Sequence, residues 1–240
     1  MAGHSKWANI RHRKAAVDAQ KNKILSRHSK LLMMAGKTDP NPESNPTLRS
    51  AIQNAKADNV PNDNITRILK KLSGEGKDGA EYQEMLYEGY APGGIPVMVS
   101  AITENVNRTF PELRLAFGKA GGTLGQSGSV GYMFDHVGVI TLPTDGRSED
   151  AVLELALDAG AEDIVYDAEE SLLITAFTEL SAVETALQAQ GVTVSKSTHV
   201  YRAKDPQQLS DAAVIEKIEK FLDRVNEVED VDEISLGAEW

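Results

Sequence analysis

Hydrophobic positions recur at helical spacing through the first part of the chain. The pattern predicts a helix from Ala15 to Ala35, where apolar and basic residues alternate irregularly and neither Pro nor Gly occurs before Gly36. A second helix is expected with Asn45 as its N-cap and Pro46 at its first position. The helical spacing in the second and third predicted helices is carried by Leu48, Ile52 and Ala55, and then by Ile65, Ile68, Leu69 and Leu72.

The pattern changes after a polar, glycine-rich break at Ser73 to Gly79, where we expect a domain boundary. Short apolar runs then alternate with helical segments. Strands are predicted over residues 85–90, 95–102, 130–134, 138–142, 163–166, 172–175 and 228–236, and helices over 106–120, 148–158, 180–190 and 210–226. Residues 192–194 and 199–202 are expected to be extended. This order predicts an α+β protein with ferredoxin-like layers, preceded by a basic helical bundle.

The composition is that of an ordinary globular protein. Of 240 residues, 41% are hydrophobic and 25% are charged, which argues against disorder. The absence of cysteine excludes disulfides and thiolate metal sites. No apolar run approaches the length that spans a bilayer, and the basic N-terminus lacks the apolar core of a signal peptide, so we expect a cytoplasmic protein with no membrane partner.

Charge is distributed very unevenly along the chain. Residues 1–78 carry 15 Lys/Arg and 7 Asp/Glu, whereas residues 79–240 carry 10 and 29, giving the overall net charge of −11. Such an asymmetry predicts a polyanion or an acidic protein surface as the partner of the basic end; the alternative is a solvated helical face. The residues expected to bind nucleic acid are Lys6, Trp7, Arg11, Arg13, Lys14, Lys21, Lys23 and Arg27.

Trp7 lies among Lys6, Arg11 and Arg13, so it offers an aromatic face beside positive charge. This combination suits stacking on unpaired RNA bases. An anchor within the hydrophobic core explains the same residue equally well.

Motifs of catalysis and metal binding are missing from the sequence. The phosphate-binding pattern GxxxxGK[ST] and histidine pairs of the HxxxH type do not occur. The glycine-rich segment GGTLGQSG at 121–128 does not match the nucleophile pattern GxSxG, because the second residue after Ser127 is Ser129 and not glycine. We therefore expect no enzyme, no cofactor, no metal site and no small-molecule substrate, and we interpret 121–128 as a turn.

The opening string MAGHSKWANIRHRKAA resembles the start of the YebC/PmpR family, which includes the mitochondrial translational activator of cytochrome c oxidase. The resemblance continues through AKADNVPNDNITRILKK, LYEGYAPGG, NVNRT and GGTLGQSGSVGYMF, with Tyr132 where a tryptophan is expected. It implies three domains: a basic helical domain at 1–79, a discontinuous α+β domain at 80–128 with 205–240, and an inserted α+β domain at 129–204.

Family members are described both as transcriptional regulators that bind promoter DNA and as ribosome-associated factors that assist translation through proline-rich stretches. The resemblance thus implies a nonenzymatic partner of DNA or of ribosomal RNA. The predicted helix from Ile65 offers only Arg67, Lys70 and Lys71 to a groove, which is a thin set for reading bases. A third hypothesis is a scaffold whose acidic domains bind basic protein surfaces.

A second contact surface is expected where the resemblance is dense, at Gly93, Gly94, Asn105, Asn107 and Arg108. Turn formation and helix capping explain the same residues equally well.

Overall fold

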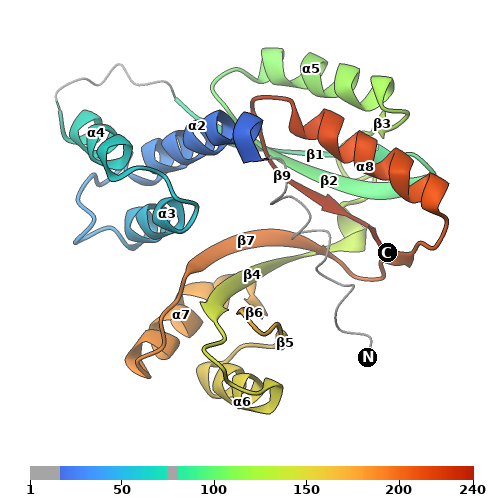
Figure 1. Cartoon of the computed structure of the whole chain (residues 1–240). Helices are drawn as coiled ribbons and strands as arrows, with labels where there is room; N and C mark the ends of the chain where they lie inside the picture. Colours follow the sequence, from blue (N-terminus) through green and yellow to red (C-terminus); the bar gives the residue numbers. More distant parts are fainter. Residues whose placement is uncertain (1–16, 75–80) are drawn as a thin grey trace.

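The computed structural model describes residues 17–74 and 81–240, with side chains from residue 22 onward (Figure 1). The chain is an α+β protein with a helical bundle at its N-terminal side and two four-stranded sheets, so the predicted fold class is confirmed.

The bundle consists of α2 (Val17–Ala35), α3 (Pro46–Ala57) and α4 (Asn62–Ser73). Its core is formed by buried side chains of all three helices and the α3–α4 connection: Leu32, Leu48, Ala55, Val60, Ile65 and Ile68. Asn45 caps α3 as predicted, because its Oδ1 accepts a hydrogen bond from Leu48 N at 3.0 Å. Its Nδ2 donates to the carbonyl oxygens of Ala35 and Asp39, each at 2.7 Å, and so ties the end of α2 to the start of α3.

The first sheet contains β1 (Gln83–Ala91), β2 (Ile95–Thr103), β3 (Thr123–Leu124) and β9 (Val231–Leu236), in the antiparallel order β3-β1-β2-β9. The helices α5 (Val106–Lys119) and α8 (Ala212–Asn226) cover one face of it (Figure 1). Their contact with each other includes the edge-to-face rings of Phe117 and Phe221, with centroids 5.0 Å apart. Near the C-terminus, β8 (Gln207–Gln208) and β10 (Ala238–Glu239) form a short parallel pair.

The second sheet contains β4 (Phe134–Pro143), β5 (Asp163–Val165), β6 (Glu170–Ala176) and β7 (Lys196–Ala203), in the order β5-β6-β4-β7. The helices α6 (Glu149–Ala159) and α7 (Leu180–Ala189) pack on it around Ile140, Leu142 and Leu173. The β-α-β-β-α-β succession with this strand order is the ferredoxin-like arrangement that the alternation of elements predicts.

One predicted strand is wrong. Residues 131–133 form a short 3-10 helix, η2 (Gly131–Met133), because a buried carboxylate fixes the loop before it: Glu88 accepts hydrogen bonds from the backbone N–H groups of Gly128, Val130 and Gly131, each at 2.7 Å. Residues 192–194, expected to be extended, do not pair as a strand of either sheet. Val192 and Val194 are buried in the core of the second sheet, so their apolar pattern reports burial rather than pairing.

Candidate nucleic-acid interface

Most of the residues predicted to bind nucleic acid lie at the N-terminal end of the chain. Five of them, namely Lys6, Trp7, Arg11, Arg13 and Lys14, fall outside the described residues, and Lys21 belongs to α2 without a described side chain. The structure therefore places only Lys23 and Arg27 of the predicted set.

Lys23 and Arg27 contact the C-terminal part of the chain. Lys23 Nζ donates to the backbone oxygen of Asn226 and, at 3.0 Å, to its side-chain Oδ1. The Arg27 guanidinium donates to both carboxylate oxygens of Asp232, with Nη2 at 3.3 Å from Oδ2. In Figure 1 the start of α2 lies beside β9, which carries Asp232. These two cations join the bundle to the first sheet.

One helical turn further, Lys30 is buried against the same region. Its Nζ lies 2.7 Å from Asp230 Oδ1 and donates to the carbonyl oxygen of Ile102 at 3.1 Å. The Asp230 carboxylate also accepts hydrogen bonds from Arg108 Nη2 at 3.0 Å and from Thr109 Oγ1 at 2.7 Å. Burial raises the pKa of Asp230, but the hydrogen bonds from Lys30, Thr109 and Arg108 outweigh it and lower the pKa to about 2.

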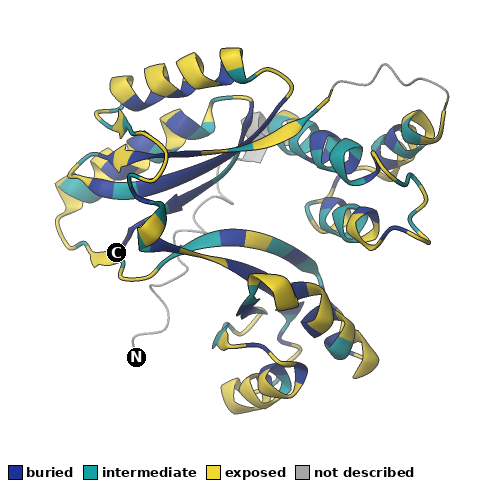
Figure 2. Cartoon of the chain, turned by 180° about the vertical axis from the view of Figure 1, so that it is seen from behind, coloured by how far each residue is buried: buried dark blue, intermediate teal, exposed yellow. Residues whose placement is uncertain are grey.

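Apart from Lys37, which follows α2 and pairs with the exposed Glu81, the exposed described cations of the bundle lie on its other two helices. Arg49 and Lys56 are exposed on α3, and Arg67, Lys70 and Lys71 are exposed on α4. Figure 2 shows the bundle helices with exposed outer faces and buried inner faces. Within the described residues, the cationic surface of the bundle is thus formed by α3 and α4, while three cations of α2 face the C-terminal part.

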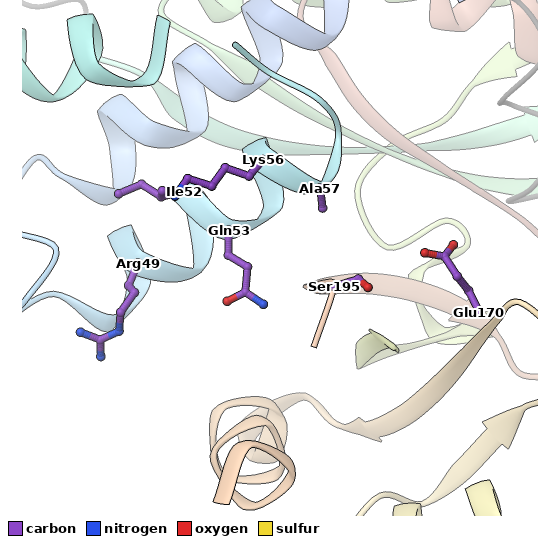
Figure 3. A pocket seen from close by; sticks show the side chains of 7 residues that line it. All are labelled: Arg49, Ile52, Gln53, Lys56, Ala57, Glu170 and Ser195. Atoms are coloured by element: carbon purple, nitrogen blue, oxygen red, sulfur yellow. The ribbon is translucent and has the colours of Figure 1, made fainter. Parts of the chain in front are cut away.

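A groove of about 600 Å³ separates α3 from the second sheet (Figure 3). Its lining combines two cations of α3 with polar side chains, apolar side chains and one acid: Arg49, Ile52, Gln53, Lys56, Ala57, Glu170 and Ser195. Figure 3 shows Gln53 pointing from α3 into the groove and Glu170 on the far side. Gln53 Nε2 donates to the carbonyl oxygen of Val194, so this contact holds the two walls together.

A second pair of contacts fixes α3 on β7. The Asn54 side chain binds both backbone groups of Ser197, accepting from its N–H at 2.9 Å and donating to its oxygen. Asp58 accepts from Lys196 Nζ at 2.9 Å and hydrogen-bonds to His28 Nε2 at 2.7 Å. Despite partial burial, which raises the pKa of Asp58, these partners hold it well below its usual range.

The five residues expected to form a second contact surface do not lie together. Gly93 and Gly94 form the β1–β2 turn with positive φ angles of 84° and 76°, whereas Asn105 caps α5 and accepts from Arg108 N at 3.2 Å. The whole of β2 separates the two groups, a span of roughly 26 Å at the usual strand rise. Arg108 binds Asp230, and only Asn107 is exposed without a role in these contacts.

Two family models match almost the whole chain. Residues 5–75 match the model described as the TACO1/YebC protein N-terminal domain, and residues 82–237 match the TACO1/YebC second and third domain. The chain belongs to the TACO1/YebC family. A relative from Aquifex aeolicus (strain VF5) is 43% identical over 240 residues, covering 100% of this chain and 96% of its own. One from Enterococcus faecalis is 41% identical over 242 residues, covering 100% and 99%.

Both TACO1/YebC relatives carry the name "Probable transcriptional regulatory protein". The fold is also similar to a solved structure, the crystal structure of a conserved hypothetical protein from Aquifex aeolicus. It superimposes with a TM-score of 0.85 at 41% sequence identity, covering 98% of this chain and 96% of the other.

The fold explains one dense part of the TACO1/YebC resemblance. Glu88 lies in LYEGYAPGG, and the three backbone N–H groups that donate hydrogen bonds to its carboxylate lie in GGTLGQSGSVGYMF. These segments are therefore joined by a buried carboxylate, which sequence analysis missed because nothing local marks Glu88 as different from other strand carboxylates.

In residues 17–74 and 81–240, no three His, Asp or Glu side chains are grouped so that they could hold a metal ion. Over the same ranges, no helix has the length and apolar character needed to cross a membrane.

Proposed function

We propose that this chain is a nonenzymatic, nucleic-acid-binding regulator of gene expression that binds DNA through its basic N-terminal part. The observation that carries the proposal is the separation of charge, +8 over residues 1–78 against −19 over the rest. A polyanion is attracted to the first part and repelled by the second, and binding releases counterions from its phosphates.

The proposed contact set consists of Lys6, Trp7, Arg11, Arg13, Lys14 and Lys21, extended by the exposed cations of α3 and α4. Lys23 and Arg27 have a second role in this proposal: they orient α2 against the C-terminal part through Asn226 and Asp232. The relatives named as probable transcriptional regulatory proteins support the regulatory part of the proposal.

Replacing Lys6, Arg11, Arg13 and Lys14 together by Gln tests this role. We expect much weaker binding to duplex DNA, measured by fluorescence anisotropy. The matched control replaces Lys204, Lys217, Lys220 and Arg224 by Gln, which removes the same charge from exposed positions of the acidic part. We expect the control variant to bind as the unmodified protein does; equal binding by all three proteins would refute the proposal.

A second candidate is a ribosome-associated translation factor that binds ribosomal RNA and relieves stalling at proline-rich stretches. It is favoured by the sparse base-reading set of α4, where the exposed cations are Arg67, Lys70 and Lys71 and no described Asn or Gln accompanies them on the last turns. Both candidates act in the cytoplasm.

Co-sedimentation with ribosomes, compared with gel shifts on random duplex DNA at physiological salt, separates the two. Sequence-dependent gel shifts without co-sedimentation support the transcriptional role. Co-sedimentation with only weak, sequence-indifferent DNA binding supports the translational role.

A further inference from the structure

Three rings from three segments form a stack on the second sheet, and a fourth ring lies at its side. His136 of β4 lies between Phe177 and Tyr201: its centroid is 4.0 Å from that of Phe177 and 4.5 Å from that of Tyr201, with interplanar angles of 29° and 8°. His199 of β7 lies at the side of this stack: its ring is tilted by 45° to Phe177, with centroids 4.4 Å apart, and is edge-on to His136 at 5.6 Å. Phe177 belongs to the short 3-10 helix η3 (Phe177–Glu179) that follows β6.

Strand register brings these rings together. β4 and β7 run side by side (Figure 1), and His136 pairs directly with Tyr201 while His199 lies opposite Gly138. Residues 199 and 201 project to the same face of β7 because side chains alternate along a strand. The connection from β6 to α7 then places Phe177 over His136.

The outer end of the stack is open. Phe177 is 43% exposed, and His136 and His199 are also exposed, whereas Tyr201 at the inner end is half-buried. Burial lowers the pKa of His136; burial and the charge of His136 lower that of His199, against a hydrogen bond to the Phe177 carbonyl that raises it. A lowered pKa favours the neutral form of each imidazole, in which its ring face carries no charge.

We propose that this ring stack is a binding site for an unpaired nucleobase, which stacks on the outer face of Phe177 and adds one more ring to the stack. This inference rests on the proposed nucleic-acid role of the chain. Base–aromatic stacking tolerates any base because each has a π-face, and the neighbouring exposed His199 can meet a base edge with a ring nitrogen.

The stack lies within reach of the bundle. Asn54 of α3 holds Ser197 of β7, and His199 follows two residues later, about 7 Å along the strand. A single strand whose phosphates meet Arg49 or Lys56 on α3 can therefore extend along β7 and place a base on Phe177.

Charge determines which part of a bound nucleic-acid strand contacts the ring stack. The segment that carries the rings, residues 134–203, contains 13 Asp/Glu and 3 Lys/Arg, so it repels phosphates. The rings must therefore bind the nucleic acid through its base, while the cations of the bundle attract its phosphate backbone. The two contributions differ in salt dependence, because stacking displaces no counterions.

The test compares an unstructured single-stranded oligoadenylate with an abasic phosphodiester strand of equal length. Both strands meet the cations, but only the first can stack. For the unmodified full chain we expect tighter binding of the intact strand by about fivefold or more. Phe177→Ala and Phe177→Leu should reduce this preference by about fivefold, whereas Phe177→Tyr should keep it because the ring remains.

Leu157→Ala serves as the matched control, since Leu157 is 59% exposed on α6, away from the rings, and should leave the preference unchanged. A preference that survives in Phe177→Ala and Phe177→Leu would overturn the ring site while leaving the basic interface intact. Binding of an arginine-rich peptide is measured on the same variants. If Phe177→Ala loses this peptide but keeps the preference for the intact strand, the rings bind a protein partner and the proposed base site is overturned. Failure of both strands to bind would overturn the ring site alone if the same protein still binds duplex DNA, whereas loss of duplex binding as well would refute the proposed function.

Discussion

Lys30 and Asp230 form a buried ion pair, 2.7 Å from Nζ to Oδ1, although 200 residues separate them in the chain. Their side chains are only 8% and 1% exposed. The pair joins α2 of the basic bundle to the segment just before β9, so one cation of the basic end serves the fold instead of a partner.

Replacing Lys30 by Met should destabilise the protein by about 3–5 kcal/mol, because it leaves a buried carboxylate with one cation fewer. The free energy of unfolding from urea denaturation measures this. Lys37→Met is the matched control, since the Lys37–Glu81 pair is exposed and its loss should change stability little. Equal effects of the two substitutions would contradict a structural role for the buried pair.

Acid should remove the stabilisation that Asp230 provides. Its pKa is lowered to about 2 in the folded chain, whereas an unfolded Asp titrates near 3.9. A lowered folded pKa gives stability that is present above the unfolded pKa and is lost as pH falls through the folded one. The stability difference between the unmodified protein and Asp230→Asn should therefore stay constant from pH 7 to about 5 and shrink between about 4 and 2. Urea denaturation across this range measures the difference; a gap that persists at pH 2 would argue against the assigned network.

The loop held by Glu88 should loosen when the carboxylate is replaced. Glu88→Gln keeps one acceptor oxygen for three backbone N–H groups, so the amide hydrogens of Gly128, Val130 and Gly131 should exchange faster. Hydrogen exchange followed by NMR measures each amide separately. Glu84→Gln, an exposed carboxylate of the same strand, provides the control and should leave all three rates unchanged.

Local chemistry allowed the sequence to predict much of the fold. Asn45 was predictable as a cap because its side chain acts within three residues, and the α5 and α8 helices follow from their apolar periodicity. The α+β class follows from the alternation of such elements.

Contacts between distant segments explain what could not be predicted. The orientation of Arg27 depends on Asp232, 205 residues away, and no local pattern distinguishes Arg27 from the other cations of α2. The ring stack is equally hidden, because His136, Phe177 and His199 have no motif spacing and meet only through the pairing of β4 with β6 and with β7.

The salt dependence of duplex DNA binding reports whether the cationic N-terminal part of the chain binds phosphates. If about six of its cations meet phosphates, the logarithm of the binding constant should fall with the logarithm of salt concentration with a slope near −5. Replacing Lys6, Arg11, Arg13 and Lys14 by Gln should flatten that slope to roughly −2. An unchanged slope in this variant would contradict the account.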